Sequence, residues 1–125
     1  MDVVVISTGG TIASTADAHG ALVPTLSGDH LVSRCGTHRE VRAIDVASLD
    51  SSSMGLAEID MLRETVHATL LDETVTGIVI THGTDSMAET ALALDLVHTD
   101  PRPVILTGAM RSADAAQPDG PGNLR

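Results

Sequence analysis

Two short segments of the chain carry threonine hydroxyl groups in positions suited to acyl chemistry. They are residues 8–12, with the sequence TGGTI, and residues 81–86, with the sequence THGTDS. Each segment directly follows a β-branched apolar run, at residues 3–6 and 78–80, that is typical of a buried strand. In an open parallel sheet, ligands collect at the carboxyl ends of strands, so turns after two strands can converge on one site. A hydroxyl held there can attack an acyl carbon while nearby N–H groups stabilise the oxyanion.

Thr11 is the candidate nucleophile of the first segment. Gly9 and Gly10 let the backbone bend close to a ligand, which brings the hydroxyl within reach of it. The alternative is an anion-binding turn in which Thr11 caps a helix, and residue types alone favour that alternative. The glycine pair does not fit the dinucleotide fingerprint, which needs the pattern GxGxxG.

The second segment places a hydroxyl beside a carboxylate. Thr84 and Asp85 could orient a substrate amine and help to move a proton. The alternative is that they cap the helix that follows. Ser86 and Glu89 fit a capping box, which predicts Ser86 as the cap and leaves Asp85 less needed for that task. His82 could act as a base, but we expect it to be a structural hydrogen-bonding residue.

A third run of hydroxyl groups lies at residues 50–54, with the sequence DSSSM, after another predicted strand. Ser51 and Ser52 could bind a carboxylate through their side chains and N–H groups, or belong to a plain solvated loop. Asp114, Asp119 and the 6 histidines of the chain lack ligand-like spacing, so the sequence predicts no metal site.

Strands and helices alternate along the predicted elements. We expect strands at 3–7, 41–46, 77–81 and 104–106, a loop or hairpin at 11–25, a polar loop at 48–53, and helices at 27–33, 57–71, from 86 to about 98 and from 122. This alternation predicts an open, mostly parallel, doubly wound α/β sheet in three layers with right-handed crossovers, of the flavodoxin-like or Rossmann-like type.

Composition narrows the class of protein. The 125 residues suit one domain, and a formal charge of -10 argues against binding to nucleic acid or to anionic membranes. No aromatic residue is present, so the core must be aliphatic. The single cysteine, Cys35, excludes an internal disulfide and suits a reducing compartment. We expect it to be buried, although Arg34 and His38 lie near it in sequence and could support a reactive thiol.

No stretch has the apolar length of a membrane span. The opening Met1-Asp2 leads directly into a strand, which leaves no room for a signal peptide. Together with the cysteine usage, these features predict a cytoplasmic protein.

Taken together, the segments at 8–13, 50–54, 80–91, 107–111 and 119–124 resemble, in this order, the bacterial-type L-asparaginase and glutaminase-asparaginase family. The resemblance implies the amino-terminal domain of that family. It also implies an amidohydrolase that converts L-asparagine, or possibly L-glutamine in addition, without metal or organic cofactor. The implied reaction yields L-aspartate and ammonia through an acyl-enzyme.

The resemblance also implies residue roles. Thr11 would be the attacking hydroxyl, and Thr84 would place water or assist transfer. Asp85 would hold the α-amine of the substrate. Ser51 would bind its α-carboxylate, with Ser52 beside it.

The chain departs from this family in three respects. It has no tyrosine to match the activating tyrosine of the loop after the first segment, where Pro24 or Thr25 lies. It has no lysine to pair with Thr84 and Asp85, since all 7 basic residues are arginine. It also lacks the second domain, which contributes to the neighbouring subunit's site. We therefore expect residues 1–125 to be an amino-terminal catalytic-domain fragment without its carboxy-terminal domain, inactive alone. The full-length protein is expected to be a homotetramer built from two dimers.

Two other functions remain open. One is the asparaginase-like subunit of a transfer-RNA amidotransferase, against which the position of Met1 directly before the first strand and the acidic charge both count. The other is a non-catalytic amino-acid-binding or interaction module with an asparaginase-like fold, which the missing lysine favours if the chain is complete.

Overall fold

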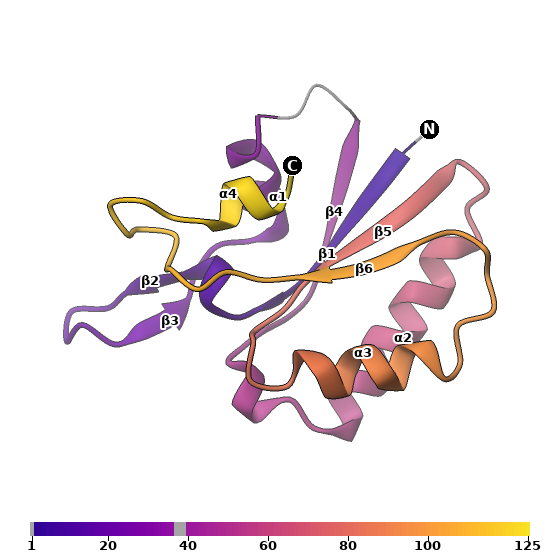
Figure 1. Cartoon of the computed structure of the whole chain (residues 1–125), viewed down its shortest axis with the longest axis horizontal. Helices are drawn as coiled ribbons and strands as arrows, with labels where there is room; N and C mark the ends of the chain where they lie inside the picture. The colour runs from indigo at the N-terminus through magenta and orange to yellow at the C-terminus, as the bar shows by residue number, and fades with distance from the viewer. Residues whose placement is uncertain (1, 37–39) are drawn as a thin grey trace.

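A computed structural model describes residues 2–36 and 40–125, which form a parallel sheet with helices on both faces (Figure 1). The sheet has the order β4-β1-β5-β6, and a separate antiparallel hairpin pairs β2 with β3. The elements are β1 (Asp2–Gly9), η1 (Thr11–Ala13), β2 (Ser14–Ala16), β3 (Leu22–Pro24), α1 (Gly28–Arg34), β4 (Val41–Leu49), η2 (Ser51–Ser53), α2 (Leu56–Leu70), β5 (Val75–Thr81), α3 (Met87–Asp95), β6 (Val104–Thr107) and α4 (Gly120–Asn123).

The order of the strands places a topological switch between β1 and β5. After β1 the chain moves outward to β4, and after crossing back it forms β5 on the other side of β1 and then β6. All these pairings are parallel. Connections that leave two neighbouring strands in opposite directions open a crevice at their carboxyl ends, which is where ligands of such sheets bind.

One face of the sheet is covered by α2 and α3. Alternate residues of a strand point to opposite faces, so Val4 and Ile6 of β1 share a face with Ile78 and Ile80 of β5. These residues pack with buried side chains of the two helices, namely Leu62, Val66, Leu70 and Leu94. The cluster is entirely aliphatic, as the sequence requires.

The opposite face carries α1. Gly28 lies against Ala43 of β4 and Ser7 of β1, and its N–H donates to the carboxylate of Asp45 at 2.7 Å. A second buried cluster on this side contains Ile12, Ala13, Leu31 and Ala109. The α/β, mostly parallel, three-layer fold predicted from sequence is therefore confirmed.

Several boundaries differ from the prediction. β4 continues past Val46 to Leu49, because Gly9 extends the pairing to Leu49 and shortens the expected polar loop. α3 ends at Asp95 rather than near His98, whose ring bonds the carbonyl of Arg102 in the turn that follows. α4 begins at Gly120 instead of residue 122. The polar stretch at 11–25 is a hairpin, the second of the alternatives considered.

Other local predictions are confirmed. Ser27 caps α1 by accepting the N–H of His30 at 3.4 Å. Cys35 is buried and donates to the carbonyl of Leu31, and burial raises the pKa of its thiol. His38, which the sequence placed near this cysteine, lies outside the described residues.

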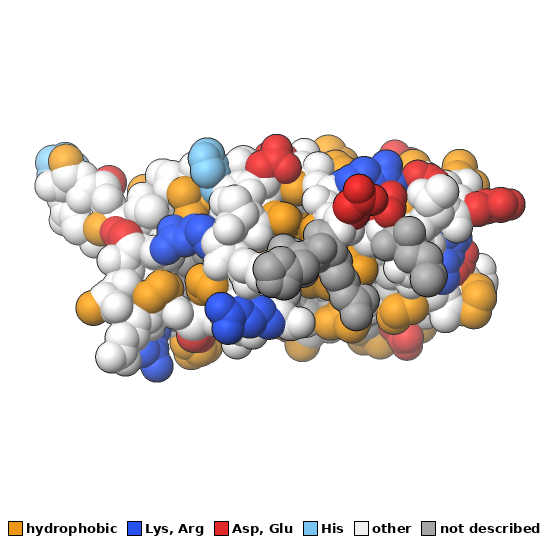
Figure 2. All heavy atoms as spheres, turned by 90° about the horizontal axis from the view of Figure 1, so that it is seen from above, with side chains coloured by type: hydrophobic (Ala, Val, Ile, Leu, Met, Phe, Trp, Pro, Cys, Tyr) orange, Lys and Arg blue, Asp and Glu red, His pale blue; other side chains and the backbone are white. Residues whose placement is uncertain are grey.

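Charged and apolar side chains are interspersed on the face that Figure 2 shows. Acidic groups lie close to arginines there rather than forming a field of one sign, although the chain carries a net charge of -10. Within residues 2–36 and 40–125, no helix is long and apolar enough to cross a bilayer.

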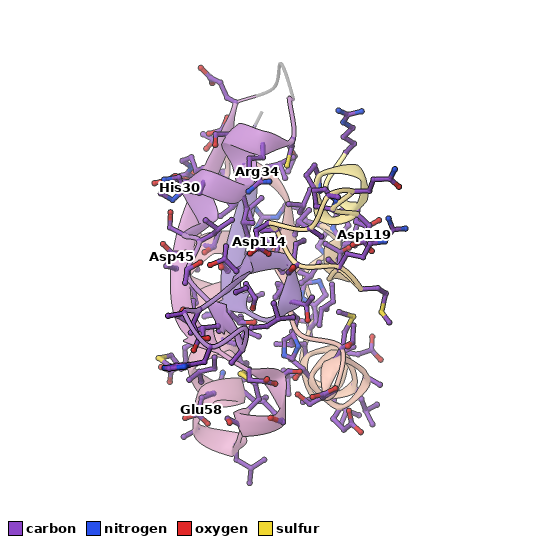
Figure 3. All side chains as sticks on the ribbon, turned by 90° about the vertical axis from the view of Figure 1, so that its left-hand side faces the viewer. His30, Arg34, Asp45, Glu58, Asp114 and Asp119 are labelled. Carbon is purple, nitrogen blue, oxygen red and sulfur yellow. The ribbon has the colours of Figure 1, made fainter. Side chains whose placement is uncertain are left out.

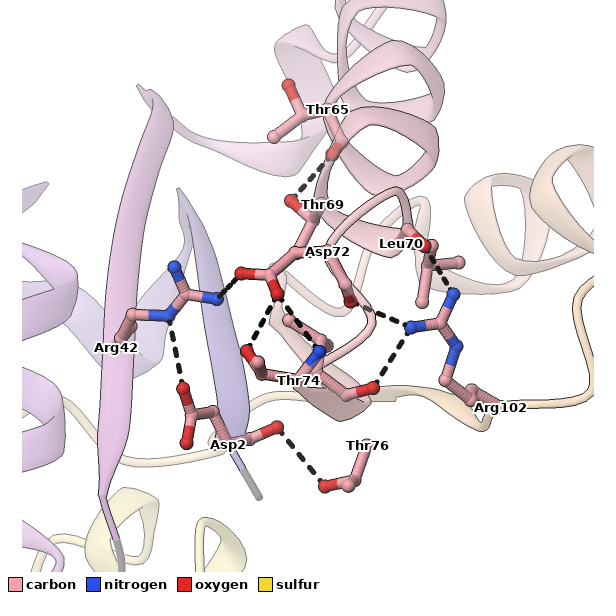
Figure 4. Close-up of polar contacts among 10 residues, drawn as sticks. Asp2, Arg42, Thr65, Thr69, Leu70, Asp72, Thr74, Thr76 and Arg102 are labelled. Carbon is pink, nitrogen blue, oxygen red and sulfur yellow. Dashed lines mark hydrogen bonds and ion pairs between the residues drawn. The ribbon is translucent and has the colours of Figure 1, made fainter.

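Two carboxylates, Asp72 and Asp100, organise the turn after α2, and Figure 4 shows the contacts of Asp72 with Thr74 and Arg42. Asp72 accepts from the side chain and N–H of Thr74 at 2.7 and 2.9 Å and from Arg42 at 2.8 Å. Arg102 forms a bidentate pair with Asp100 and also donates to the carbonyls of Leu70, Asp72 and Val75. One guanidinium therefore binds the carbonyl at the end of α2 together with a carbonyl of the turn and one of β5.

These contacts predict an acid-sensitive stability. Hydrogen bonds from Thr74 and then Arg42 lower the pKa of Asp72 to about 2, and those from Arg102 hold the pKa of Asp100 below its usual range. Because each folded pKa lies below the value of about 3.9 for an unfolded Asp, both carboxylates stabilise the fold above that pH and lose this effect as the pH falls toward 2. We expect Tm, followed by circular dichroism, to fall between pH 5 and pH 2. Asp72→Asn should flatten that decline, and a variant that follows the wild-type curve would contradict this assignment.

Candidate active site

The carboxyl ends of the strands lie in register at one edge of the sheet. Ser7 pairs with Thr81, and Thr81 pairs in turn with Thr107. The hydroxyl of Thr8 donates to the carbonyl of Thr81 at 2.9 Å, which ties the end of β1 directly to the end of β5. The turns that begin at these strand ends therefore start side by side, as the sequence predicted.

Close backbone contact joins the two turns. Gly10 has a φ of 76° and a ψ of -179°, a conformation that is essentially restricted to glycine. A Cβ atom at Gly10 would lie 2.5 Å from the backbone nitrogen of Gly83, so only glycine fits there. The N–H of Gly10 donates to the carbonyl of Leu49 at 2.9 Å, which fixes the turn on the β4 side as well. Thr11 follows immediately.

A cavity of about 120 Å³ lies where these turns meet. It is lined by Gly10, Thr11, Ser14, Leu22, Pro24, Asp50, Ser51, Gly83, Thr84 and Asp85. The strand ends of β1, β4 and β5 thus bring together Thr11, Ser51, Thr84 and Asp85, the residues singled out from sequence. Ser52 is outside the lining: it is exposed, and its hydroxyl donates to Asp50 at 3.1 Å.

A larger hollow of about 770 Å³ lies elsewhere, between α2, α3 and β6. Most of its lining is aliphatic, and none of the residues of the two threonine turns contributes to it. Size alone therefore does not identify the site, because the chemistry-bearing side chains converge on the smaller cavity.

Ser51 links the end of β4 to the second turn. Its side chain is 3% exposed, and its hydroxyl accepts the N–H of Asp85 at 3.1 Å. The hydroxyl of Ser86 donates to the carbonyl of Ser51 at 2.7 Å. Ser86 is the N-cap residue of α3, as predicted, but the predicted capping box with Glu89 is wrong, because the hydroxyl of Ser86 makes no cap and is used across the site. The proton of the Ser51 hydroxyl remains available for an acceptor in the cavity.

His82 links the second turn to helix α3. Its side chain is completely buried, with Nδ1 2.7 Å from the carbonyl of Gly83 and Nε2 3.0 Å from the hydroxyl of Thr90 on α3. The carbonyl can only accept, so Nδ1 carries a proton, and Nε2 can accept from the Thr90 hydroxyl. The prediction that His82 is a structural hydrogen-bonding residue is confirmed.

Sequence reasoning missed several lining residues. Ser14, whose hydroxyl donates to the carbonyl of Gly10 at 2.8 Å, and Leu22 reach the cavity only because the hairpin folds back beside η1. Asp50 directly follows β4, and this position after a strand could have marked it as a cavity-lining residue. Within the described parts of the chain, no group of at least three His, Cys, Asp or Glu side chains could hold a metal ion.

Comparison with known proteins identifies the origin of this arrangement. The family model described as "Asparaginase, N-terminal" matches residues 2–125. The chain belongs to the asparaginase family. It is similar to "Probable L-asparaginase 4" of Schizosaccharomyces pombe, with 34% identity over 98% of the chain and 36% of that relative. The chain thus spans about a third of the length of this asparaginase.

Solved asparaginase structures share the fold. The thermostable L-asparaginase from Thermococcus kodakarensis superposes with a TM-score of 0.86 at 35% identity, over 99% of this chain and 38% of the other. The probable cytoplasmic L-asparaginase from Campylobacter jejuni gives a TM-score of 0.81 at 36% identity, over 98% and 37%. The asparaginase resemblance predicted from the sequence segments is confirmed at the level of family and fold.

Proposed function

We propose that a longer protein containing this chain hydrolyses L-asparagine to L-aspartate and ammonia at the cavity described above. One observation carries the proposal: Thr11, Thr84, Asp85 and Ser51, which come from three strand ends, line a single cavity at the topological switch point. The names of the similar proteins point to the same substrate.

The cavity offers complementary groups for a zwitterionic amino acid. The carboxylate of Asp85 would hold the α-ammonium group, and the hydroxyl of Ser51 would donate to the α-carboxylate. The N–H of Asp85 donates to Ser51, so these two substrate-binding groups hold each other in place. A substrate fixed at both charges would direct its side-chain amide toward the threonine hydroxyls.

Thr11 is our candidate nucleophile. Its hydroxyl oxygen would bond to the amide carbon of the substrate, and the C–N bond would break as the departing nitrogen takes a proton to leave as ammonia. Water would then add to the acyl-threonine ester, releasing L-aspartate and returning a proton to Thr11. Thr84 would place that water or assist the transfer.

The base for Thr11 is proposed to come from outside residues 1–125. The chain contains neither lysine nor tyrosine, and a neutral threonine hydroxyl is a poor nucleophile without a base. We therefore propose that residues 1–125 are an amino-terminal catalytic domain that is inactive alone. From its membership of the asparaginase family we further propose that the longer protein is a cytoplasmic homotetramer. A net charge of -10 favours a small-molecule ligand over nucleic acid or membrane.

Ammonia release from L-asparagine, L-glutamine and a no-substrate control tests the proposal directly. The longer protein should release ammonia from L-asparagine, and residues 1–125 should not. Turnover by residues 1–125 at the rate of the longer protein would contradict the need for an outside base. Absence of turnover by the longer protein would contradict the proposed activity.

Replacement of Ser51 gives a graded test of substrate binding. Ser51→Ala removes a donor to the α-carboxylate, and since a hydrogen bond to a charged group contributes about 1.5–3 kcal/mol, KM should rise about 10- to 100-fold. Ser52→Ala is the matched control, because this neighbouring hydroxyl lies outside the cavity, and its KM should stay within about two-fold of wild type. Equal effects of the two substitutions would contradict the role given to Ser51.

A second candidate is an amino-acid-binding module with the same fold, which the missing lysine favours only if no lysine from outside residues 1–125 reaches the cavity. Calorimetry with L-aspartate and L-asparagine discriminates the two. Binding of both without any turnover by the longer protein would favour the binding module.

A further inference from the structure

The β2–β3 hairpin forms one wall of the cavity. Ser14, Leu22 and Pro24 of this hairpin line the cavity beside Thr11. Residues 16–23 are exposed, and Figure 1 shows the tip of the hairpin projecting beyond the sheet. The hairpin has little buried surface of its own, so its position depends on the hydrogen bonds at its base and along its edge.

The outer edge of β2 is paired with the segment that follows β6. The N–H of Ala113 donates to the carbonyl of Ser14 at 2.9 Å, in the manner of a neighbouring strand. Two residues further along, the N–H of Ala16 donates to a carboxylate oxygen of Asp114 at 2.8 Å. A side-chain carboxylate therefore stands where the next strand carbonyl would be expected.

Asp114 is itself held firmly. Its second carboxylate oxygen accepts the hydroxyl of Ser112 at 2.7 Å. Arg34 of α1 donates to the carbonyl of Ala113 at 2.7 Å, and Figure 3 shows Arg34 close above Asp114. The hydrogen bonds from Ala16 and Ser112 lower the pKa of Asp114, so its carboxyl group is ionised near neutral pH. An ionised carboxylate accepts a stronger hydrogen bond than a neutral carboxyl group does.

We propose that Asp114 is a positioning residue that fastens the hairpin in the place where Leu22 and Pro24 close the cavity. Its effect on the substrate rests on the proposed function, whereas its effect on the hairpin does not. Thr11 is held separately, because Gly10 is bonded to Leu49 and Ala13 donates to the carbonyl of Gly10. Loss of the carboxylate should loosen the wall and leave the nucleophile in place.

Asp114→Ala and Asp114→Asn in the longer protein separate this role from a general loss of stability. In the alanine variant, the amide of Ala16 and its hairpin neighbours should exchange with deuterium at least about 10-fold faster, since a charge-assisted bond is lost. KM for L-asparagine should rise about 5- to 20-fold while kcat changes less than about three-fold. The asparagine variant keeps an acceptor for Ala16 and should restore exchange and KM to within about three-fold of wild type.

Asp60→Ala is the matched control, because it removes the same charge from an exposed pair with Arg63 on α2. It should leave hairpin exchange and KM unchanged. Unaltered hairpin exchange in Asp114→Ala would overturn the proposal, as would a fall in kcat that Asp114→Asn does not reverse. In a protein that releases no ammonia from L-asparagine, the proposed function fails, and the exchange comparison alone then decides the role of Asp114.

Discussion

Replacing Thr11 with alanine in the longer protein is expected to lower kcat for L-asparagine by at least about 10³-fold without unfolding the domain. Alanine removes only the hydroxyl and one methyl group of the threonine side chain. Thr11 lines a cavity rather than the core, so the fold should tolerate this loss. Because we assign the ester-forming hydroxyl to Thr11, turnover should nearly vanish while circular dichroism and Tm stay close to wild type.

Three companion variants make this test specific. Thr11→Ser keeps a hydroxyl and should retain at least about a tenth of kcat, whereas Thr84→Val should lower kcat but still allow an acyl adduct to accumulate. Thr65→Ala is the control, since Thr65 lies on α2 and donates to the carbonyl of Met61. Mass spectrometry of the quenched enzyme locates the adduct. An adduct on Thr84, or full activity of Thr11→Ala, would move the nucleophile away from Thr11.

Gly10→Ala is expected to cost about 3–5 kcal/mol of folding free energy, or to prevent folding. Two effects add. A φ of 76° with a ψ of -179° strains any residue that has a Cβ atom. The new methyl group would also lie 2.5 Å from the nitrogen and 2.6 Å from the Cα of Gly83. Gly83 cannot retreat, because Ser51 packs against its other side, where an added Cβ would be 2.4 Å from the Ser51 hydroxyl.

Gly20→Ala separates strain from contact. Gly20 also has a positive φ, of 81°, but nothing lies within 4 Å of an added Cβ. Its substitution should therefore cost only about 1–2 kcal/mol. Urea unfolding of both variants gives the comparison. Equal losses would mean that the approach of the two turns contributes nothing beyond backbone strain.

Local sequence signals were sufficient for the sheet and for the residues at its edge. The β-branched runs at 3–6 and 78–80 predicted buried strands, and the turns after them were expected to converge because parallel strands end on the same side. The end of β4 was placed too early, at Val46, because the extra residues are recruited by pairing with Gly9 and by the bond from Gly10 to Leu49. The pattern of apolar residues within 41–49 does not predict this pairing of Leu49 with Gly9.

The capping box that does not form at the start of α3 has the same origin. Ser86 and Glu89 satisfy the spacing of a capping box, yet the hydroxyl of Ser86 bonds the carbonyl of Ser51, 35 residues away in sequence. Ser14, Leu22 and Asp114 were also beyond reach of local pattern, since the hairpin and the segment after β6 meet only in the folded chain. Contacts between segments distant in sequence decide these positions.

The central place of β1 in the sheet governs when the site can form during synthesis. β1 precedes both of its neighbours in the chain, and one of them, β5, begins only at Val75. The bond from Thr8 to Thr81 spans 73 residues, so one side of β1 stays unpaired in the nascent chain until β5 has been synthesised. Such late, long-range pairing is slow, and we expect the open side of β1 to be the segment that chaperones protect.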